Sequence, residues 1–95
     1  MSIDWTERAV NDLESLLEYI AQDDLPTAQR VGGDILEVVS RLERFPGSGK
    51  PGRVKGTREL LLVPRGLPYV VVYEAGVQSV CILRVLHSAR EWPPA

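Results

Sequence analysis

Apolar residues recur at helical spacing over the first part of the chain. The stripe consists of Ala9, Leu13, Leu16, Leu17 and Ile20, with mostly polar residues between them. This spacing predicts a helix that buries one face. Thr6 is suited to cap the helix, and Glu7 then lies favourably in its first turn. We expect the helix to end near Gln22.

A second helical stripe follows a break at residues 23–26. Asp24 can cap a new helix that has Pro26 in its first turn, where a missing N–H costs little. The apolar positions of this helix are Ala28, Val31, Ile35, Val38, Val39 and Leu42. Gly32 and Gly33 weaken it by roughly 1 kcal/mol each relative to alanine, but they would allow close packing against the first helix. The short linker predicts an antiparallel helical hairpin.

The pattern changes from helical to extended after residues 45–52. That segment holds three glycines and two prolines, which predicts a loop. Strands are expected over residues 57–63, 69–74 and 77–87, with short turns between them. Residues 2–5 are expected to add a short strand before the first helix.

These elements predict an α+β domain in the order β-α-α-β-β-β. The short turns favour an antiparallel meander for the last three strands. The helical hairpin must bury its apolar stripe, and one face of the sheet is the only large apolar surface available to it. We therefore expect a single domain over residues 1–95, in which an N-terminal helical hairpin packs on a mainly antiparallel sheet of three to four strands.

The second face of this sheet has two possible fates. By simple alternation, Ser79, Cys81, Leu83, Val85 and His87 share one face of the last strand, and Val80, Ile82, Arg84 and Leu86 share the other. Both faces are largely apolar, and the helices can cover only one of them. The second face is then either an open apolar partner site with a basic rim, or it is covered by loops and the tail at residues 91–95.

Composition places the chain among ordinary folded domains. It is 44% hydrophobic and 25% charged, and its net charge of −2 gives no general attraction to nucleic acid or to an anionic membrane. The charge is unevenly distributed, however. Residues 1–24 hold more than half of the 13 acidic residues, whereas residues 50–65 are basic.

Cysteine and histidine counts limit the chemistry further. The single cysteine, Cys81, excludes an internal disulfide, which fits a reducing compartment. One histidine and no paired cysteines argue against a zinc site, and we expect neither metal nor cofactor. No apolar stretch approaches the ~20 residues of a membrane span. We expect a soluble, cytoplasmic protein without membrane contact.

A basic and aromatic set remains as the candidate for function. It comprises Arg53, Lys55, Arg58, Arg84, His87, Arg90 and Trp92, together with Tyr69 and Tyr73. Such a set could hold RNA phosphates while His87 moves a proton, or it could grip an acidic protein segment. Alternatively, His87 only forms a hydrogen bond at the strand end, and Trp92 anchors the tail on the domain.

Four segments, in this order, resemble the RelE/ParE superfamily of toxins from type II toxin–antitoxin modules. They are WTERAVNDLESLLEYIA from Trp5, FPGSGKPGRVKGTREL from Phe45, PYVVVYE from Pro68 and ILRVLHSAREWP from Ile82. The likeness covers nearly the whole chain. Each segment is only moderately specific, but together they fit the β-α-α-β-β-β plan.

The resemblance implies a cognate antitoxin whose C-terminal segment wraps the toxin, and an oligomeric state set through that antitoxin. It also implies one of two targets: ParE-like members inhibit DNA gyrase, and RelE-like members cut mRNA on the ribosome. The residues expected to bind antitoxin or target are Arg53, Arg58, Arg65, Tyr73, Arg84, His87, Arg90 and Trp92. A nuclease would be a metal-independent mRNA endoribonuclease with Arg58, Arg84 and His87 as its catalytic candidates.

One departure from the nuclease pattern favours the ParE-like group. RelE-like nucleases carry an arginine early in the penultimate strand, and its place here falls to Pro68 or Tyr69. Arg65 lies in the preceding turn, where a side chain is poorly preorganised for catalysis. Loss of one transition-state contact can lower a rate by ~10²–10³. We therefore expect a growth-arresting toxin that inhibits gyrase, with mRNA cleavage as the alternative.

Overall fold

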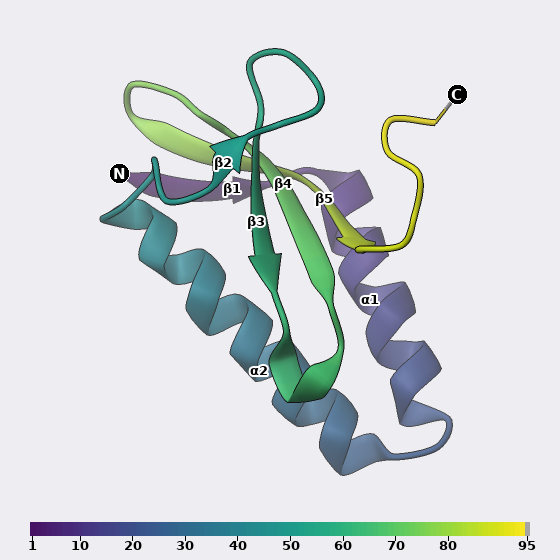
Figure 1. Ribbon diagram of the computed structural model, residues 1–95. Helices are drawn as coiled ribbons and strands as arrows, with labels where there is room; N and C mark the ends of the chain where they lie inside the picture. Colours follow the sequence, from purple (N-terminus) through teal and green to yellow (C-terminus); the bar gives the residue numbers. More distant parts are fainter. Residues whose placement is uncertain (95) are drawn as a thin grey trace.

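Two helices cover one face of a five-stranded sheet in the computed structural model, which describes residues 1–94 (Figure 1). The elements are β1 (Ser2–Trp5), α1 (Glu7–Ala21), α2 (Leu25–Ser40), a 3₁₀ turn η1 (Arg41–Glu43), β2 (Lys50–Pro51), β3 (Arg58–Leu62), a 3₁₀ turn η2 (Pro64–Gly66), β4 (Tyr69–Ala75) and β5 (Ser79–His87). The strand order is β1-β5-β4-β3-β2. β1 runs parallel to β5 and the other pairs are antiparallel, which confirms the predicted α+β class and element order. The two-residue strand β2 lies in the segment predicted as loop.

Both helices begin at the predicted caps. The Thr6 hydroxyl accepts a hydrogen bond from the Ala9 N–H at 3.0 Å, and the Asp24 carboxylate accepts one from the Thr27 N–H at 3.1 Å. These bonds satisfy N–H groups that have no partner within the helix. Residues 22–24 join α1 to α2, so the predicted hairpin is confirmed.

The two glycines of α2 have different surroundings. A Cβ at Gly32 would lie 3.1 Å from Cδ1 of Leu17, so this glycine allows close contact between α1 and α2. A Cβ at Gly33 would meet nothing within 4 Å. Close packing therefore accounts for Gly32 and not for Gly33.

The main core lies between the helices and the covered face of the sheet. Its largest fully buried side chains include Ile35 and Leu42 from the helical half, and Tyr73 and Ile82 from the sheet. The Tyr73 hydroxyl donates to the carbonyl of Pro46 at 2.7 Å and accepts from the Gly49 N–H at 2.9 Å. Tyr73 therefore ties the loop before β2 to the core.

A β-bulge breaks the alternation predicted for the last strand. Val72 pairs with Arg84 whereas Tyr73 pairs with Ile82, so β5 carries one extra residue, Leu83. Val85 consequently joins Ile82 in the main core, and Leu83 packs on the opposite face. The prediction that Leu83 and Val85 share a face is wrong, because strict alternation assumes a strand without a bulge.

The tail covers the part of the second face that β4 and β5 form. Val70, Val72 and Leu86 form a small cluster there, and none of the three is more than 8% exposed. Trp92 and Leu83 pack against this cluster. The tail turns back after the end of β5, as Figure 1 shows. The predicted covering by the tail is confirmed for the β4–β5 part of this face, whereas Leu61 of β3, which pairs with Val70, stays 61% exposed.

Neither helix within residues 1–94 has both the length and the apolar character that crossing a membrane requires.

The contrast between the two glycines gives a first prediction. Gly33→Ala should raise the free energy of unfolding by about 0.8–1 kcal/mol, because it removes a poor helix former from an open site. Gly32→Val should lower the free energy by about 1–3 kcal/mol, because the side chain would overpack against Leu17. Urea unfolding of both variants checks this. Equal effects at the two positions would contradict the packing described here.

Candidate functional site

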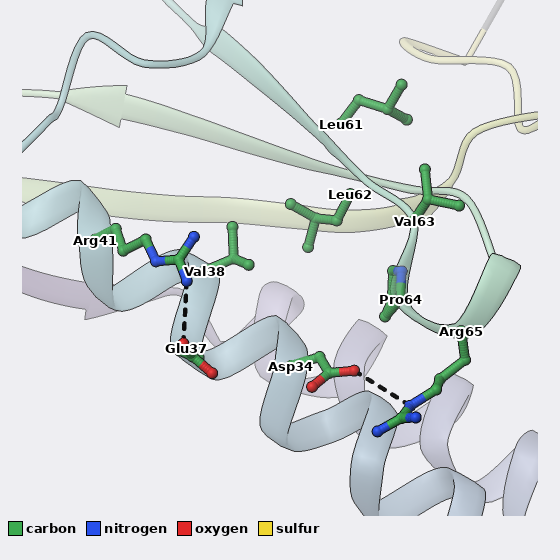
Figure 2. Close-up of a pocket in the computed structure, with 9 residues that line it drawn as sticks. All are labelled: Asp34, Glu37, Val38, Arg41, Leu61, Leu62, Val63, Pro64 and Arg65. Carbon is green, nitrogen blue, oxygen red and sulfur yellow. Dashed lines mark hydrogen bonds and ion pairs between the residues drawn. The ribbon is translucent and has the colours of Figure 1, made fainter.

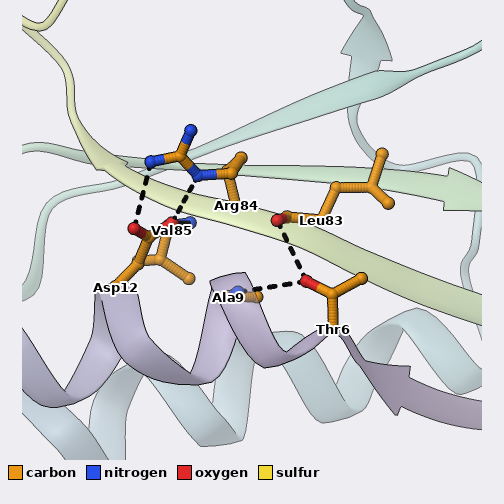
Figure 3. Close-up of polar contacts among 6 residues, drawn as sticks. All are labelled: Thr6, Ala9, Asp12, Leu83, Arg84 and Val85. Carbon is orange, nitrogen blue, oxygen red and sulfur yellow. Dashed lines mark hydrogen bonds and ion pairs between the residues drawn. The ribbon is translucent and has the colours of Figure 1, made fainter.

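Helix α1 lies along the part of β5 that β1 leaves unpaired. β1 pairs with β5 only as far as Ile82. Beyond that point Thr6 forms hydrogen bonds with the backbone of β5. Its N–H donates to the carbonyl of Ile82 at 3.0 Å, and its hydroxyl donates to the carbonyl of Leu83 at 3.1 Å. The Asp12 carboxylate then accepts from the N–H of Val85 at 3.0 Å (Figure 3). α1 thus satisfies backbone groups that a third strand would otherwise pair.

Arg84 forms a nearly buried ion pair with the same carboxylate. Its Nε and Nη2 donate to the two oxygens of Asp12 at 2.7 Å and 3.1 Å. The Arg84 and Asp12 side chains are only 7% and 13% exposed. Hydrogen bonding to Asp12 raises the pKa of Arg84 above its ordinary value, although burial acts in the opposite direction. Arg84 is therefore a permanent cation whose charge is neutralised inside the fold.

Trp92 stacks on this ion pair. The centre of the Arg84 guanidinium lies 5.3 Å from the centroid of the Trp92 ring, within the range of a cation–π contact. The indole N–H of Trp92 is buried and has no hydrogen-bond acceptor in the part of the chain that the structure describes. The predicted role of Trp92 as a tail anchor is confirmed.

The arginines of the basic segment are also bound to the protein itself. The Arg53 backbone N–H and guanidinium bond the Glu59 carboxylate at 2.8–3.1 Å. Arg58 Nη1 donates to the carbonyl of Gly49 at 2.8 Å, and more weakly to that of Gly47 at 3.5 Å. These contacts hold residues 47–53 against β3.

Burial alone would raise the pKa of Glu59, whose side chain is 4% exposed. The hydrogen bonds and charge of Arg53, with the charge of Lys50, outweigh this effect and hold the pKa below its ordinary value. Glu59 is therefore a buried carboxylate whose charged form is stabilised by the loop.

Arg65 lies apart from the other predicted site residues. It adopts a left-handed backbone conformation, with φ of 55°, and forms an exposed ion pair with Asp34 at 3.6 Å. This pair borders a groove of about 590 Å³ between α2 and the end of β3, where Leu61 and Val63 are exposed (Figure 2).

His87 and Arg90 are exposed at the end of β5. The His87 Nδ1 accepts from the N–H of Ala89 at 3.1 Å, and its ring meets Tyr69 edge-to-face at 5.8 Å between centroids. Burial raises the pKa of Tyr69. His87 and Arg90 line a groove of about 410 Å³ together with residues of α1, including Tyr19.

The structure thus divides the predicted site residues into separate groups. Tyr73 is fully buried and Arg84 is nearly so, and both are fixed by hydrogen bonds. Of the nuclease candidates, Arg58 is bonded to the loop before β2, Arg84 to α1, and only His87 is exposed. Within residues 1–94, no three His, Cys, Asp or Glu side chains gather in a way that could hold a metal ion.

Sequence reasoning missed Tyr19. Its side chain is 75% exposed although it is a large aromatic, and it shares the groove with His87. The available signal was its position in α1, outside the apolar stripe formed by Leu16, Leu17 and Ile20.

Comparison with known proteins agrees with this architecture. The model of a family described as the ParE toxin of type II toxin–antitoxin systems, parDE, matches residues 3–92. The chain belongs to this ParE toxin family. It is 42% identical over 91 residues to toxin Y4kP of Sinorhizobium fredii, covering 96% of this chain and 92% of that protein.

Two further matches support the family assignment. Toxin RelE2 of Caulobacter vibrioides is 35% identical to this ParE-family chain over 86 residues, which are 90% of this chain and 93% of that protein. A solved structure of the chromosomal ParDE system of P. aeruginosa superposes with a TM-score of 0.75 and 28% identity, over 92% of this chain and 95% of that one. The resemblance to the RelE/ParE superfamily is therefore confirmed.

The Asp12–Arg84 pair should dominate the stability of this ParE-family fold. Asp12→Ala leaves a buried cation unpaired, so it should lower the free energy of unfolding by about 3–5 kcal/mol. The double variant Asp12→Ala with Arg84→Met should recover part of that loss. Denaturant unfolding measures both, with Glu14→Ala as an exposed control on the same helix. A loss near that of the control would contradict a structural role for the pair.

Glu59 should make stability depend on pH in the acidic range. The pKa of Glu59 is lowered in the folded protein. Its contribution to the free energy of unfolding is therefore complete at pH values above its ordinary pKa of 4.5, and it is lost as the pH falls through the pKa of the folded state. Glu59→Gln should cost about 1–3 kcal/mol at pH 7, and the difference from the native chain should shrink in acid. Unfolding curves at several pH values test this, with exposed Glu43→Gln as the control. A difference that does not depend on pH would contradict the prediction.

Proposed function

We propose that this chain arrests growth by binding and inhibiting DNA gyrase in the cytoplasm, and that a cognate antitoxin neutralises it. Membership of the ParE toxin family supports a toxin with an antitoxin partner. The choice of gyrase over mRNA as the target rests on the hydrogen bonds that the arginines already form within the protein. Arg84 is paired with Asp12, and Arg58 is bonded to loop carbonyls.

A nuclease needs cations that face the substrate. Catalysis of phosphoryl transfer depends on donors aimed at the charge that develops in the transition state. A guanidinium that already binds a buried carboxylate cannot supply that charge without breaking its own pair. The penultimate strand also begins with Tyr69, which is buried, in the place where the resemblance would require an arginine.

Messenger RNA cleavage remains the second candidate because of His87. Its ring is exposed, it is oriented by Ala89 and Tyr69, and it lies near Arg90. A histidine in that position could transfer a proton. The 35% identical relative also carries the name toxin RelE2.

A pulse of expression separates the two targets. We expect growth arrest with loss of gyrase supercoiling activity and with intact mRNA ends. The measurement combines mapping of mRNA ends with a supercoiling assay of purified gyrase and purified chain. His87→Ala provides an internal control, because it should abolish mRNA cleavage by a nuclease.

Each outcome decides between the proposals. Codon-phased mRNA cuts that disappear in His87→Ala, with normal supercoiling, would overturn gyrase inhibition. Absence of growth arrest would contradict both targets and would indicate a chain that retains antitoxin binding alone.

A further inference from the structure

The groove between α1 and the end of β5 differs from the rest of the surface. Leu16 and Tyr19 of α1 line one side, and Tyr69, His87 and Arg90 line the other, around about 410 Å³. Tyr19 is 75% exposed, and it belongs to neither of the two apolar clusters among the described residues. A large aromatic placed in a groove without a packing role is typical of a contact residue.

The groove has one uncompensated positive charge. Asp12 also lines it, but both oxygens of Asp12 are bonded to Arg84 and one also accepts from Val85. Within residues 1–94, Arg90 forms no ion pair. The carboxylate and guanidinium at the base of the groove therefore cancel, and Arg90 remains as the cation that an incoming group would meet.

His87 adds a directed donor. Its Nδ1 accepts a hydrogen bond from the N–H of Ala89, so the neutral ring carries its proton on Nε2. No acceptor for that proton is present in the described part of the chain. The edge-to-face contact with Tyr69 fixes the plane of the ring. Arg90 and His87 thus offer donors to an anion in one groove with apolar and aromatic walls.

These features favour a peptide carboxylate over an RNA phosphate backbone. Among the described residues that line the groove, Arg90 is the one cation without an ion pair, and α1 contributes the paired Asp12 with Ser15, Leu16 and Tyr19. Nucleic-acid binding depends on several phosphate contacts, and a single unpaired cation supplies one of them. A single acidic side chain with apolar neighbours needs only hydrogen-bond donors such as Arg90 and His87 and an apolar surface beside them, and the groove supplies both.

We infer that this groove is an anchor site for the antitoxin, which inserts one acidic side chain flanked by aliphatic residues. The inference rests on the proposed function only in assuming an antitoxin partner, the one partner class that the toxin–antitoxin family itself implies. The carboxylate lies against Arg90 and His87, and its aliphatic neighbours pack on Leu16 and Tyr19. The anchor lies beside α1 at the end of β5, whereas Trp92 packs against Val70, Val72 and Leu86 on the second face.

Blocked tripeptides test the chemistry of the groove without any natural partner. Acetyl-Leu-Glu-Leu-amide should shift the NMR signals of Tyr19, His87 and Arg90 in a saturable manner, and acetyl-Leu-Gln-Leu-amide should bind about tenfold more weakly. The dinucleotide UpA serves as the RNA probe. Equal binding of the two peptides, no binding, or stronger binding of UpA would overturn the inference.

Affinity for the cognate antitoxin that the proposed function requires tests whether the antitoxin is the ligand of this groove. Arg90→Glu and Tyr19→Ala should each weaken binding by about 10- to 30-fold, and Tyr19→Phe should stay within about threefold of the native chain. Arg44→Glu and Leu36→Ala make the same kinds of change at exposed positions outside the groove and should have no effect. Unchanged affinity in the groove variants would overturn the inference.

The two proposals fail in different ways. A native chain that binds antitoxin but leaves gyrase active contradicts the proposed target and leaves the anchor site standing. Groove variants that lose gyrase inhibition but keep antitoxin affinity would assign the groove to the target and overturn the antitoxin anchor.

Discussion

The structure depends on one carboxylate at the point where β1 ends. Asp12 receives two hydrogen bonds from Arg84 and a third from the Val85 N–H. β5 is a central strand for its first half and would be an exposed edge for its second half, because β1 is only four residues long. A buried edge must have its backbone groups satisfied. Thr6 and Asp12 form these hydrogen bonds with the backbone of β5, and they thereby fix the position of α1 along the sheet.

The same constraint decides which charges can act on another molecule. Arg84 sits between Asp12 and the Trp92 ring, and it neutralises a carboxylate that would otherwise be costly to bury. Arg53 does the same for Glu59. The arginines of the basic set, which appear uniform in the sequence, are thus divided between Arg53, Arg58 and Arg84, which are bonded within the fold, and Arg90 beyond the end of β5. That division favours binding of a protein partner over stabilisation of a phosphoryl transition state.

Local signals in the sequence were sufficient for the helices and for the element order. Thr6 and Asp24 act on N–H groups three residues away, so their capping role can be read from neighbours in the chain. The bulge at Leu83 depends on how β5 pairs with β4, and the burial of Arg84 depends on Asp12, 72 positions away in the chain; periodicity reports neither contact. For the same reason, the sequence left the cover of the second face as one of two alternatives, and the exposure of Tyr19 beside His87 became evident only in the fold.

The most direct test of this account is hydrogen exchange at the Nε–H of Arg84, followed by ¹⁵N NMR. An Nε–H that donates to Asp12 at 2.7 Å and is nearly buried should be protected, and it should exchange only through opening of the α1–β5 contact. We expect a resolved Arg84 signal with protection close to that of the Val85 amide. Exchange as fast as that of exposed Arg44 would contradict it, because Arg84 would then be available to bind a substrate.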